Sequence, residues 1–463
     1  MRKKFGITLA TATAAALTGG LLVATAGPAA GLTPVLLATP APAAVAKHHD
    51  DFNGDGRRDL VYGGTNDVDR EGGTVNVLHG TAGGLDTARV HRIHQGSPGV
   101  PGTGEEDDWF GETAASADLN KDGYADLVVG NPTEHVGSAE YRGSVTVVWG
   151  SKAGLSGGTN VSPASGAGGR HAQFGRDVAT GDFTGDGSPD LVVIGGGEAW
   201  LYRGPFTKAG ATGKVSRIDK TGSGWYSHGL AAGRTNGDGK TDLVILGTQF
   251  YGSEQRHRIW SLTGSSSGLS SGPSKTFSSE PWAATIGDFD KNGYGDIAVG
   301  LPDQGNGRGA VTVWRGTSSG PSGSTTFTQA TAGVSGSPEA DDNFGYAVSA
   351  ADANGDGYAD LAVGVPHEDV GGHDDQGGVH LFRGGSGGLS GARSSWIPQT
   401  VVGPADDHLS FGFAVRLRDL TADGRADLAL GAAQRGVVLR GTSALPTTDA
   451  ATPLPDFEGG FTD

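Results

Sequence analysis

Seven short segments of this chain place oxygen-bearing side chains at alternate positions, a spacing that suits a divalent cation. Each segment has a polar side chain at positions 1, 3 and 5, glycine at position 6 and aspartate at position 9. The first segment carries Asp51, Asn53, Asp55, Gly56 and Asp59. Ca²⁺ binds about six to eight oxygen atoms and needs glycine where a loop turns sharply, whereas Mg²⁺ prefers to keep its waters. With the backbone carbonyl of position 7 as a further ligand, the pattern predicts loops that bind calcium.

Six of the segments carry a complete ligand set with three carboxylates each, and we predict up to six calcium ions. The alternative is that each segment forms turns through its own Asp and Asn side chains without a metal. The predicted ligands, at positions 1, 3, 5, 7 and 9 of each segment, are Asp51, Asn53, Asp55, Arg57 and Asp59; Asp118, Asn120, Asp122, Tyr124 and Asp126; Asp182, Thr184, Asp186, Ser188 and Asp190; Asp288, Asp290, Asn292, Tyr294 and Asp296; Asp352, Asn354, Asp356, Tyr358 and Asp360; and Asp419, Thr421, Asp423, Arg425 and Asp427.

The fourth segment departs from this pattern because Arg234 replaces the first carboxylate and leaves Asp238 and Asp242. We predict that the loop from Arg234 to Asp242 binds no calcium and that the guanidinium pairs with these carboxylates instead. In the other six loops we expect calcium to stabilise the hairpins and to take no part in capturing a ligand.

The sequence around each segment predicts strands. Short Val, Leu or Ile runs that end at glycine follow each position 9, and these are typical of buried strands. A second strand closed by glycine follows each time, for example over 143–150 and 309–316, and Phe-Gly stands eight residues before four of the segments. The segments start 67, 64, 52, 54, 64 and 67 residues apart. Each unit is therefore a small antiparallel sheet, and seven sheets arranged radially form an all-β propeller. The 84 glycines argue against a helical bundle.

The Phe-Gly pairs, the Asp-rich hairpins and the Gly-x-Pro turns at 130–132, 300–302 and 364–366 resemble FG-GAP repeats. Such repeats form the seven-bladed propeller of integrin α-subunits and of many secreted bacterial proteins. The resemblance covers residues 47–441 and implies that the Asp-rich loops lie on the face away from the ligand. It identifies a fold more strongly than a function, since the family includes adhesion receptors, lectin-like proteins and propellers attached to enzymes.

The two ends of the chain differ in composition from the repeats. Residues 1–46 begin with Arg2-Lys3-Lys4 and continue as an apolar, Ala-rich stretch, which is typical of a signal peptide with a leader, and cleavage could follow Ala26 or Ala46. We therefore expect a secreted protein without a membrane anchor. The first strand of the first repeat would fall near 45–50, and the tail, 442–463, could supply a closing strand.

Composition and the remaining motifs limit the function. A net charge of −17 argues against nucleic acid as a partner, and the lack of cysteine excludes disulfides. No nucleophile elbow, zinc-protease motif or phosphate loop is present, so we expect no enzyme. The polar loops before Phe-Gly and after Gly-x-Pro could merely solvate strand ends, or could form an acidic rim with His135, His367 and His373 as possible metal ligands.

The chain has eight tryptophans, and aromatic faces of this kind can stack on sugar rings. We predict that Trp149, Trp200, Trp260 and Trp314 pack between blades, and that Trp109, Trp225 and Trp282 are the better ligand candidates. The sequence thus favours a secreted, monomeric, calcium-stabilised adhesion or recognition module with an extracellular protein or glycan ligand. The second hypothesis is a lectin-like propeller, and the third is a propeller hydrolase or lyase that acts on polysaccharide.

Overall fold

The structure is a computed structural model that describes residues 46–64, 72–164, 172–219, 224–432, 435–457 and 459–461. Apart from Ala46, the predicted signal peptide and leader lie outside the described residues. All described residues belong to one compact unit, Ala43–Asp463. This unit consists of β-sheets and two short 3-10 helices, η1 (Gly391–Arg393) and η2 (Gln399–Val401).

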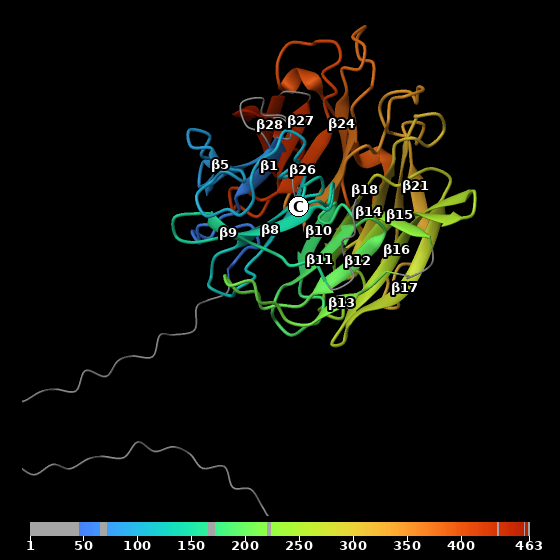
Figure 1. The fold of residues 1–463 in the computed structure, drawn as a ribbon. Helices are drawn as coiled ribbons and strands as arrows, with labels where there is room; N and C mark the ends of the chain where they lie inside the picture. Colours follow the sequence, from blue (N-terminus) through green and yellow to red (C-terminus); the bar gives the residue numbers. More distant parts are fainter. Residues whose placement is uncertain are drawn as a thin grey trace, which may run out of the picture. The chain divides into compact units, whose positions relative to one another are not determined.

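Seven antiparallel sheets follow one another along the chain and surround a common axis (Figure 1). The first is three-stranded and the other six have four strands each, in sequence order. The strands are β1 (Leu60–Gly64), β2 (Thr74–Leu78) and β5 (His91–Ile93) in blade 1; β6 (Thr113–Ala117), β7 (Asp126–Asn131), β8 (Ser144–Trp149) and β9 (Ser156–Asn160) in blade 2; β10 (Asp177–Gly181), β11 (Asp190–Gly195), β12 (Glu198–Tyr202) and β13 (Val215–Arg217) in blade 3; β14 (Trp225–Gly233), β15 (Asp242–Tyr251), β16 (Glu254–Ser265) and β17 (Gly268–Phe277) in blade 4.

The remaining strands are β18 (Ala283–Gly287), β19 (Asp296–Leu301), β20 (Ala310–Trp314) and β21 (Ser324–Phe327) in blade 5; β22 (Val348–Ala351), β23 (Asp360–Val365), β24 (Gly378–Phe382) and β25 (Ser394–Pro398) in blade 6; β26 (Ala414–Arg418), β27 (Asp427–Ala432), β28 (Arg435–Arg440) and β29 (Thr447–Leu454) in blade 7. A small ribbon of β3 (Gly80–Thr81) and β4 (Gly84–Leu85) follows β2. This arrangement confirms the predicted seven-bladed propeller.

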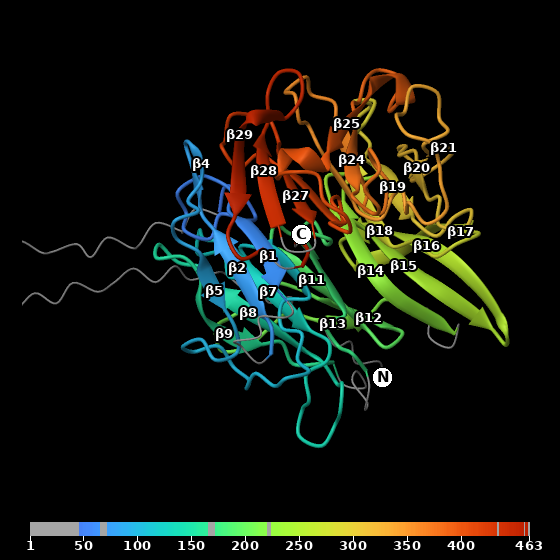
Figure 2. The same cartoon turned by 90° about the horizontal axis from the view of Figure 1, so that it is seen from above.

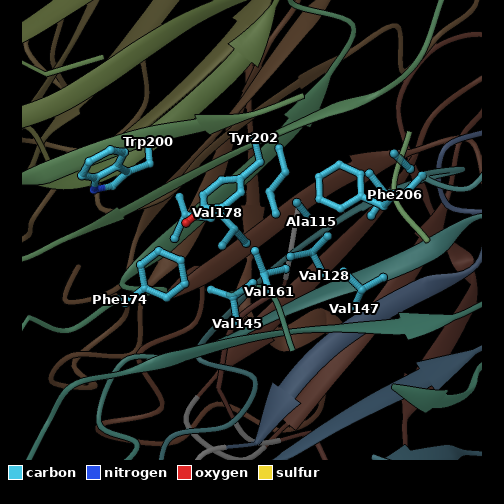
Figure 3. Close-up of a cluster of buried hydrophobic side chains, with 14 of the residues drawn as sticks. Ala115, Val128, Val145, Val147, Val161, Phe174, Val178, Trp200, Tyr202 and Phe206 are labelled. Atoms are coloured by element: carbon cyan, nitrogen blue, oxygen red, sulfur yellow. The ribbon is translucent and has the colours of Figure 1, made fainter. Parts of the chain in front are cut away.

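Hydrophobic side chains fill the space between neighbouring blades. Each of the seven buried clusters among the described residues combines side chains of two adjacent blades, and one of them joins blade 7 to blade 1. The second strand of a blade is buried on both faces, which is why β7, β11, β19, β23 and β27 are buried at every residue. Figure 3 shows the cluster between blades 2 and 3, where Phe174 and Trp200 lie among valines of both blades.

The Phe-Gly pair is explained by this packing. Phe344 is fully buried between blades 5 and 6, and it forms a parallel bridge with Gly309 of blade 5. The next residue, Gly345, has φ +91°, and a Cβ atom there would lie 2.6 Å from the carbonyl oxygen of Ala310. Only glycine combines this conformation with so close an approach to the neighbouring blade.

The C-terminal segment completes the ring. The tail contains β29, which is the outer strand of blade 7, and Phe461 forms a bridge with Tyr62 of β1. The Gly63 N–H donates to the Gly460 carbonyl at 3.0 Å. Residues 46–50 form bends and turns, so the first strand expected near 45–50 is not found in the described part of that segment. Blade 1 is therefore joined on its inner side by the C-terminal segment.

Blade 4 differs from the others in strand length. Its strands have 9, 10, 12 and 10 residues, and β15 and β16 extend beyond the neighbouring blades in Figure 2. None of the described residues forms a helix long and apolar enough to cross a membrane.

Candidate functional site

In blades 2 to 7 the Asp-rich loops connect the first and second strands, and in blade 1 the loop precedes β1. The position 9 aspartate of each loop has a structural role. In blade 2, Asp126 accepts the Leu119 N–H at 3.0 Å and the Gly150 N–H at 2.9 Å, so it joins the loop to the end of the third strand. The same bond to the third-strand glycine recurs in all seven blades at 2.8–3.0 Å. These aspartates are buried, and their carboxylates accept hydrogen bonds from buried backbone N–H groups that would otherwise lack this acceptor.

Positions 1, 3 and 5 bend the loop through hydrogen bonds to its own backbone. Asp51 accepts the N–H groups of Asp55 and Gly56 at 3.1 and 2.8 Å, and Asn53 accepts that of Asp55 at 2.9 Å. Asp55 accepts the Arg57 N–H through one oxygen at 2.9 Å. The other complete loops repeat most of these bonds. The side-chain turns that the sequence left as an alternative are thus present.

The donor set of these loops is compatible with calcium. It contains only oxygen, with three carboxylates in each complete loop, and the glycine at position 6 has φ between +81° and +94°. Burial raises the pKa of Asp126 to about 7 and the pKa values of Asp190, Asp296 and Asp360 to about 6. A cation bound nearby would act in the opposite direction, because it would favour the charged forms of these carboxyl groups. In the described residues, however, no three His, Asp or Glu side chains stand close enough together to hold a metal ion.

Several loops contact cationic side chains. Arg315 pairs with Asp290, Arg440 lies 3.6 Å from Asp423, and Lys208 lies 3.6 Å from Asp122. In blade 1, the Nδ1 atom of His79 lies 3.0 Å from Asp59, whose hydrogen bond and charge raise the pKa of His79. A divalent ion would compete with these groups for the same carboxylates.

The fourth loop lacks the first carboxylate and is held differently from the prediction. Thr235 donates to Asp242 through both its N–H and its hydroxyl, at 2.8 and 2.7 Å, and Lys240 pairs with Asp238 at 3.2 Å. The exposed Arg234 lines a cavity of about 530 Å³ within the ring of blades. Local hydrogen bonds and Lys240 therefore take the place that we expected the guanidinium to fill.

A second cavity, of about 380 Å³, lies at the other end of the inner strands. Its wall contains the residue that follows each Phe-Gly pair or its equivalent, together with Phe461 from the C-terminal segment. We call this ring of seven residues the channel mouth: Glu112, Arg176, His228, Trp282, Tyr346, Phe413 and Phe461. The Asp-rich loops leave the opposite ends of these inner strands, so the channel mouth and the loops lie on different faces.

One side of the channel mouth is aromatic. The Tyr346 ring lies between Trp282 and Phe413, with centroids 5.2 and 5.0 Å away. Trp282 and Phe413 remain 46% and 40% exposed, respectively, although both are large apolar side chains. Three adjacent blades thus present a continuous row of accessible aromatic rings to the cavity.

The other side is polar and comes from blades 2, 3 and 4. The Arg176 guanidinium lies 5.2 Å from the centre of the Tyr226 ring and donates to Gln173 at 3.1 Å. Glu112 is exposed to the cavity, yet desolvation raises its pKa to about 7 against the opposing effect of Arg176. His228 is the extra residue of a β-bulge and lies 3.3 Å from Glu280, and burial lowers its pKa.

The three tryptophans predicted as ligand contacts lie in different environments. Trp282 lines the channel mouth, Trp109 is 45% exposed but lies outside this cavity, and Trp225 is half-buried against Trp260 at 6.5 Å. The packing prediction is confirmed for the four tryptophans expected between blades, since Trp149, Trp200, Trp260 and Trp314 are at most 9% exposed and belong to interblade clusters.

The three rim histidines each contact a side chain nearby: His135 lies 3.4 Å from Glu105, His373 2.9 Å from Asp407, and His367 2.5 Å from Asn343.

Six of the seven residues of the channel mouth were not predicted from the sequence as ligand contacts. A signal was present, because Glu112, Arg176, Tyr346 and Phe413 directly follow Phe-Gly.

Comparison with known proteins supports the repeat assignment. Residues 110–148 and 344–382 match the FG-GAP repeat family, and residues 182–245 match the FG-GAP-like repeat. Integrin alpha pat-2 of Caenorhabditis briggsae is 27% identical over 310 residues, which cover 62% of this chain and 25% of that protein. Integrin alpha-E of Mus musculus is 34% identical over 24% of this chain and 10% of its own length.

A phosphatidylinositol-glycan-specific phospholipase D of Rattus norvegicus is 30% identical over 34% of this chain and 20% of its own length. The chain spans a quarter or less of each of these relatives. Among solved structures, the Dos1 propeller aligns over 86% of this chain and 83% of its own, with 12% identity and a TM-score of 0.42. The chain thus carries FG-GAP repeats within a seven-bladed propeller, and parts of it are similar to integrin α subunits.

Proposed function

We propose that this chain is a secreted binding module of the adhesion or recognition type, which takes an extracellular ligand at the channel mouth. The observation that supports this most directly is the exposed aromatic row of Trp282, Tyr346 and Phe413 in a cavity at the face away from the Asp-rich loops. Exposed aromatic side chains around a concave site with a few polar groups are a common feature of ligand sites. The integrin α relatives support an extracellular binding role.

We further propose that the six complete loops bind calcium and that this calcium is structural. The side-chain oxygens of positions 1, 3, 5 and 9, three of them carboxylates in each loop, and the carbonyl of position 7 would hold the ion, which would offset two of the three negative charges in each loop. Because these loops lie at the opposite ends of the inner strands from the channel mouth, the ion would stabilise the blade without touching the ligand.

The test is a binding screen of the purified chain against extracellular-matrix proteins and glycans, with calcium and with chelator. We expect a ligand whose binding is lost in Phe413→Ala and kept in Phe250→Ala, a control at a similarly exposed phenylalanine outside the channel mouth. Chelation should lower the melting temperature. Binding that survives Phe413→Ala and Tyr346→Ala, or no binding by a folded protein to any member of the panel, would contradict the proposal.

A further inference from the structure

The chemistry of the channel mouth indicates a class of ligand. The aromatic side, formed by blades 5 to 7, offers two half-exposed rings, Trp282 and Phe413, with Tyr346 between them. Aromatic faces carry a partial negative charge and favour apolar C–H groups that lie flat against them. A ligand that fits here has at least one apolar face.

The polar side restricts the charge of that ligand. Arg176 would repel a cation, whereas the ionised form of Glu112 would repel an anion, as would the net charge of −17 on the whole chain. The two side chains are close enough for Arg176 to lower the pKa of Glu112. A fixed charge of either sign is therefore a poor match for this side of the mouth.

The same groups suit hydroxyls. Arg176 supplies only donors and an ionised Glu112 supplies only acceptors, whereas the imidazole of His228, whose Nε2 atom lies 3.3 Å from Glu280, can offer its other nitrogen as an acceptor when it is neutral. Burial favours this neutral form of His228. A hydroxyl both donates and accepts, so a row of hydroxyls can use all three side chains at once.

We infer that the channel mouth binds a neutral glycan, with pyranose rings stacked on Trp282 and on Phe413 and hydroxyls bonded to Glu112, Arg176 and His228. This inference rests on the proposed binding function and names the ligand class of that site. A pyranose combines an apolar face of C–H groups with equatorial hydroxyls, which is the combination that the two sides of the mouth select. A cavity of about 380 Å³ falls at the small end of typical ligand pockets, as expected for one or two sugar units rather than a folded partner.

The chain offers a closely matched control. Trp282 is 46% exposed and lines the mouth, whereas Trp109 is 45% exposed and lies outside it. Trp282→Ala and Trp109→Ala therefore remove equally accessible side chains, and neither should prevent folding. Phe413→Ala provides a second variant on the other side of Tyr346.

The experiment is calorimetric titration of the chain with cellohexaose, laminarihexaose, mannohexaose and N-acetylchitohexaose, with oligogalacturonate and oligolysine as charged probes, and a parallel screen against matrix proteins. We expect one neutral oligosaccharide to bind, with affinity reduced at least about tenfold by Trp282→Ala and by Phe413→Ala and unchanged by Trp109→Ala. Equal loss in Trp109→Ala, or binding of a charged probe alone, overturns the inference. No saccharide binding, together with a matrix protein whose binding needs Trp282, overturns the glycan class but keeps the proposed function. Failure of every probe in both screens by the folded protein overturns both.

Discussion

Asp126 accepts the backbone N–H of Gly150 at 2.9 Å, and this bond joins the Asp-rich loop of blade 2 to the end of its third strand. The equivalent bond is present in all seven blades, including blade 4, whose loop lacks the first carboxylate. The aspartate at position 9 is thus part of the fold whether or not the loop holds a cation. The ligands at positions 3 and 5, of which only Thr184 and Thr421 are buried, do not accept this bond.

This difference predicts two separable effects on stability. Asp126→Ala leaves the Gly150 N–H buried without this acceptor, at a cost of about 1–3 kcal/mol, whereas the Leu119 N–H keeps the Ala117 carbonyl at 3.0 Å. We expect a lower melting temperature in calcium and in EGTA alike. Asp122→Ala should lower the melting temperature only when calcium is present. Calorimetry in both buffers checks this, and a variant Asp126→Ala as stable as wild type in EGTA would contradict the structural role.

Metal content provides a second prediction. After dialysis against calcium, elemental analysis should find about six ions per chain if every complete loop binds one. Asp122→Ala should remove one ion, whereas Asp238→Ala in the fourth loop should remove none. Seven ions, or a loss in Asp238→Ala, would mean that the fourth loop binds calcium. A metal-free chain would contradict the calcium proposal as a whole.

The sequence predicted the repeating parts of this molecule better than the parts that occur once. Blade number, the loops and the packing of Trp149 and Trp260 follow from local patterns that recur seven times. The pairing of Phe461 with Tyr62 depends on two segments far apart in the sequence, and no local pattern encodes it. The channel mouth was predicted only at Trp282, because its members are similar in position and not in residue type. Their common feature is that they follow Phe-Gly or its equivalent.

The same limits apply to the fourth loop. The sequence shows that Arg234 replaces the first carboxylate of this loop. It does not show which side chains bond to the two remaining carboxylates. Thr235 and Lys240 bond to Asp242 and Asp238 because they lie next to them in the folded loop, whereas the Arg234 side chain extends toward the cavity within the ring. The residue types alone could not predict which side chain would bond to which carboxylate of this loop.

The Phe-Gly glycine predicts a strong dependence on side-chain size. Gly345→Ala places a Cβ 2.6 Å from the Ala310 carbonyl oxygen at φ +91°, so the neighbouring blade would have to move. Gly323 has φ +70° and open space around its missing Cβ, so Gly323→Ala carries only the conformational cost of about 1 kcal/mol. Urea unfolding should show a clearly larger loss for Gly345→Ala. Equal losses would mean that the close contact between blades is unimportant.

His380 predicts part of the response to pH. Burial lowers the pKa of His380 to about 4, below its ordinary value of 6.5, so the folded chain holds it neutral among Phe344, Phe382 and Trp396. The unfolded chain takes up this proton first, and the stability associated with neutral His380 is therefore lost as the pH falls from about 6.5 towards 4. His380→Phe keeps an aromatic ring and removes the titration. The variant should lose less stability than wild type over this interval, and parallel pH profiles would refute the assignment.

Closure of the ring can be tested at the C-terminal segment. Phe457 is only 2% exposed and packs against Tyr62 of blade 1, with ring centroids 5.6 Å apart, and against Phe461 at 5.1 Å. Removing a buried phenylalanine side chain costs about 3–5 kcal/mol, because the contacts are lost and a cavity remains. Phe457→Ala should therefore destabilise the propeller strongly and should increase amide exchange first in β1 and in β27, the strands that this cluster joins. Phe250→Ala removes a side chain that is 41% exposed at the end of β15 and should change stability by less than about 0.5 kcal/mol. If the two variants were equally stable, the C-terminal segment would not hold blades 7 and 1 together, and the ring would depend on the direct contacts between β26 and the first blade.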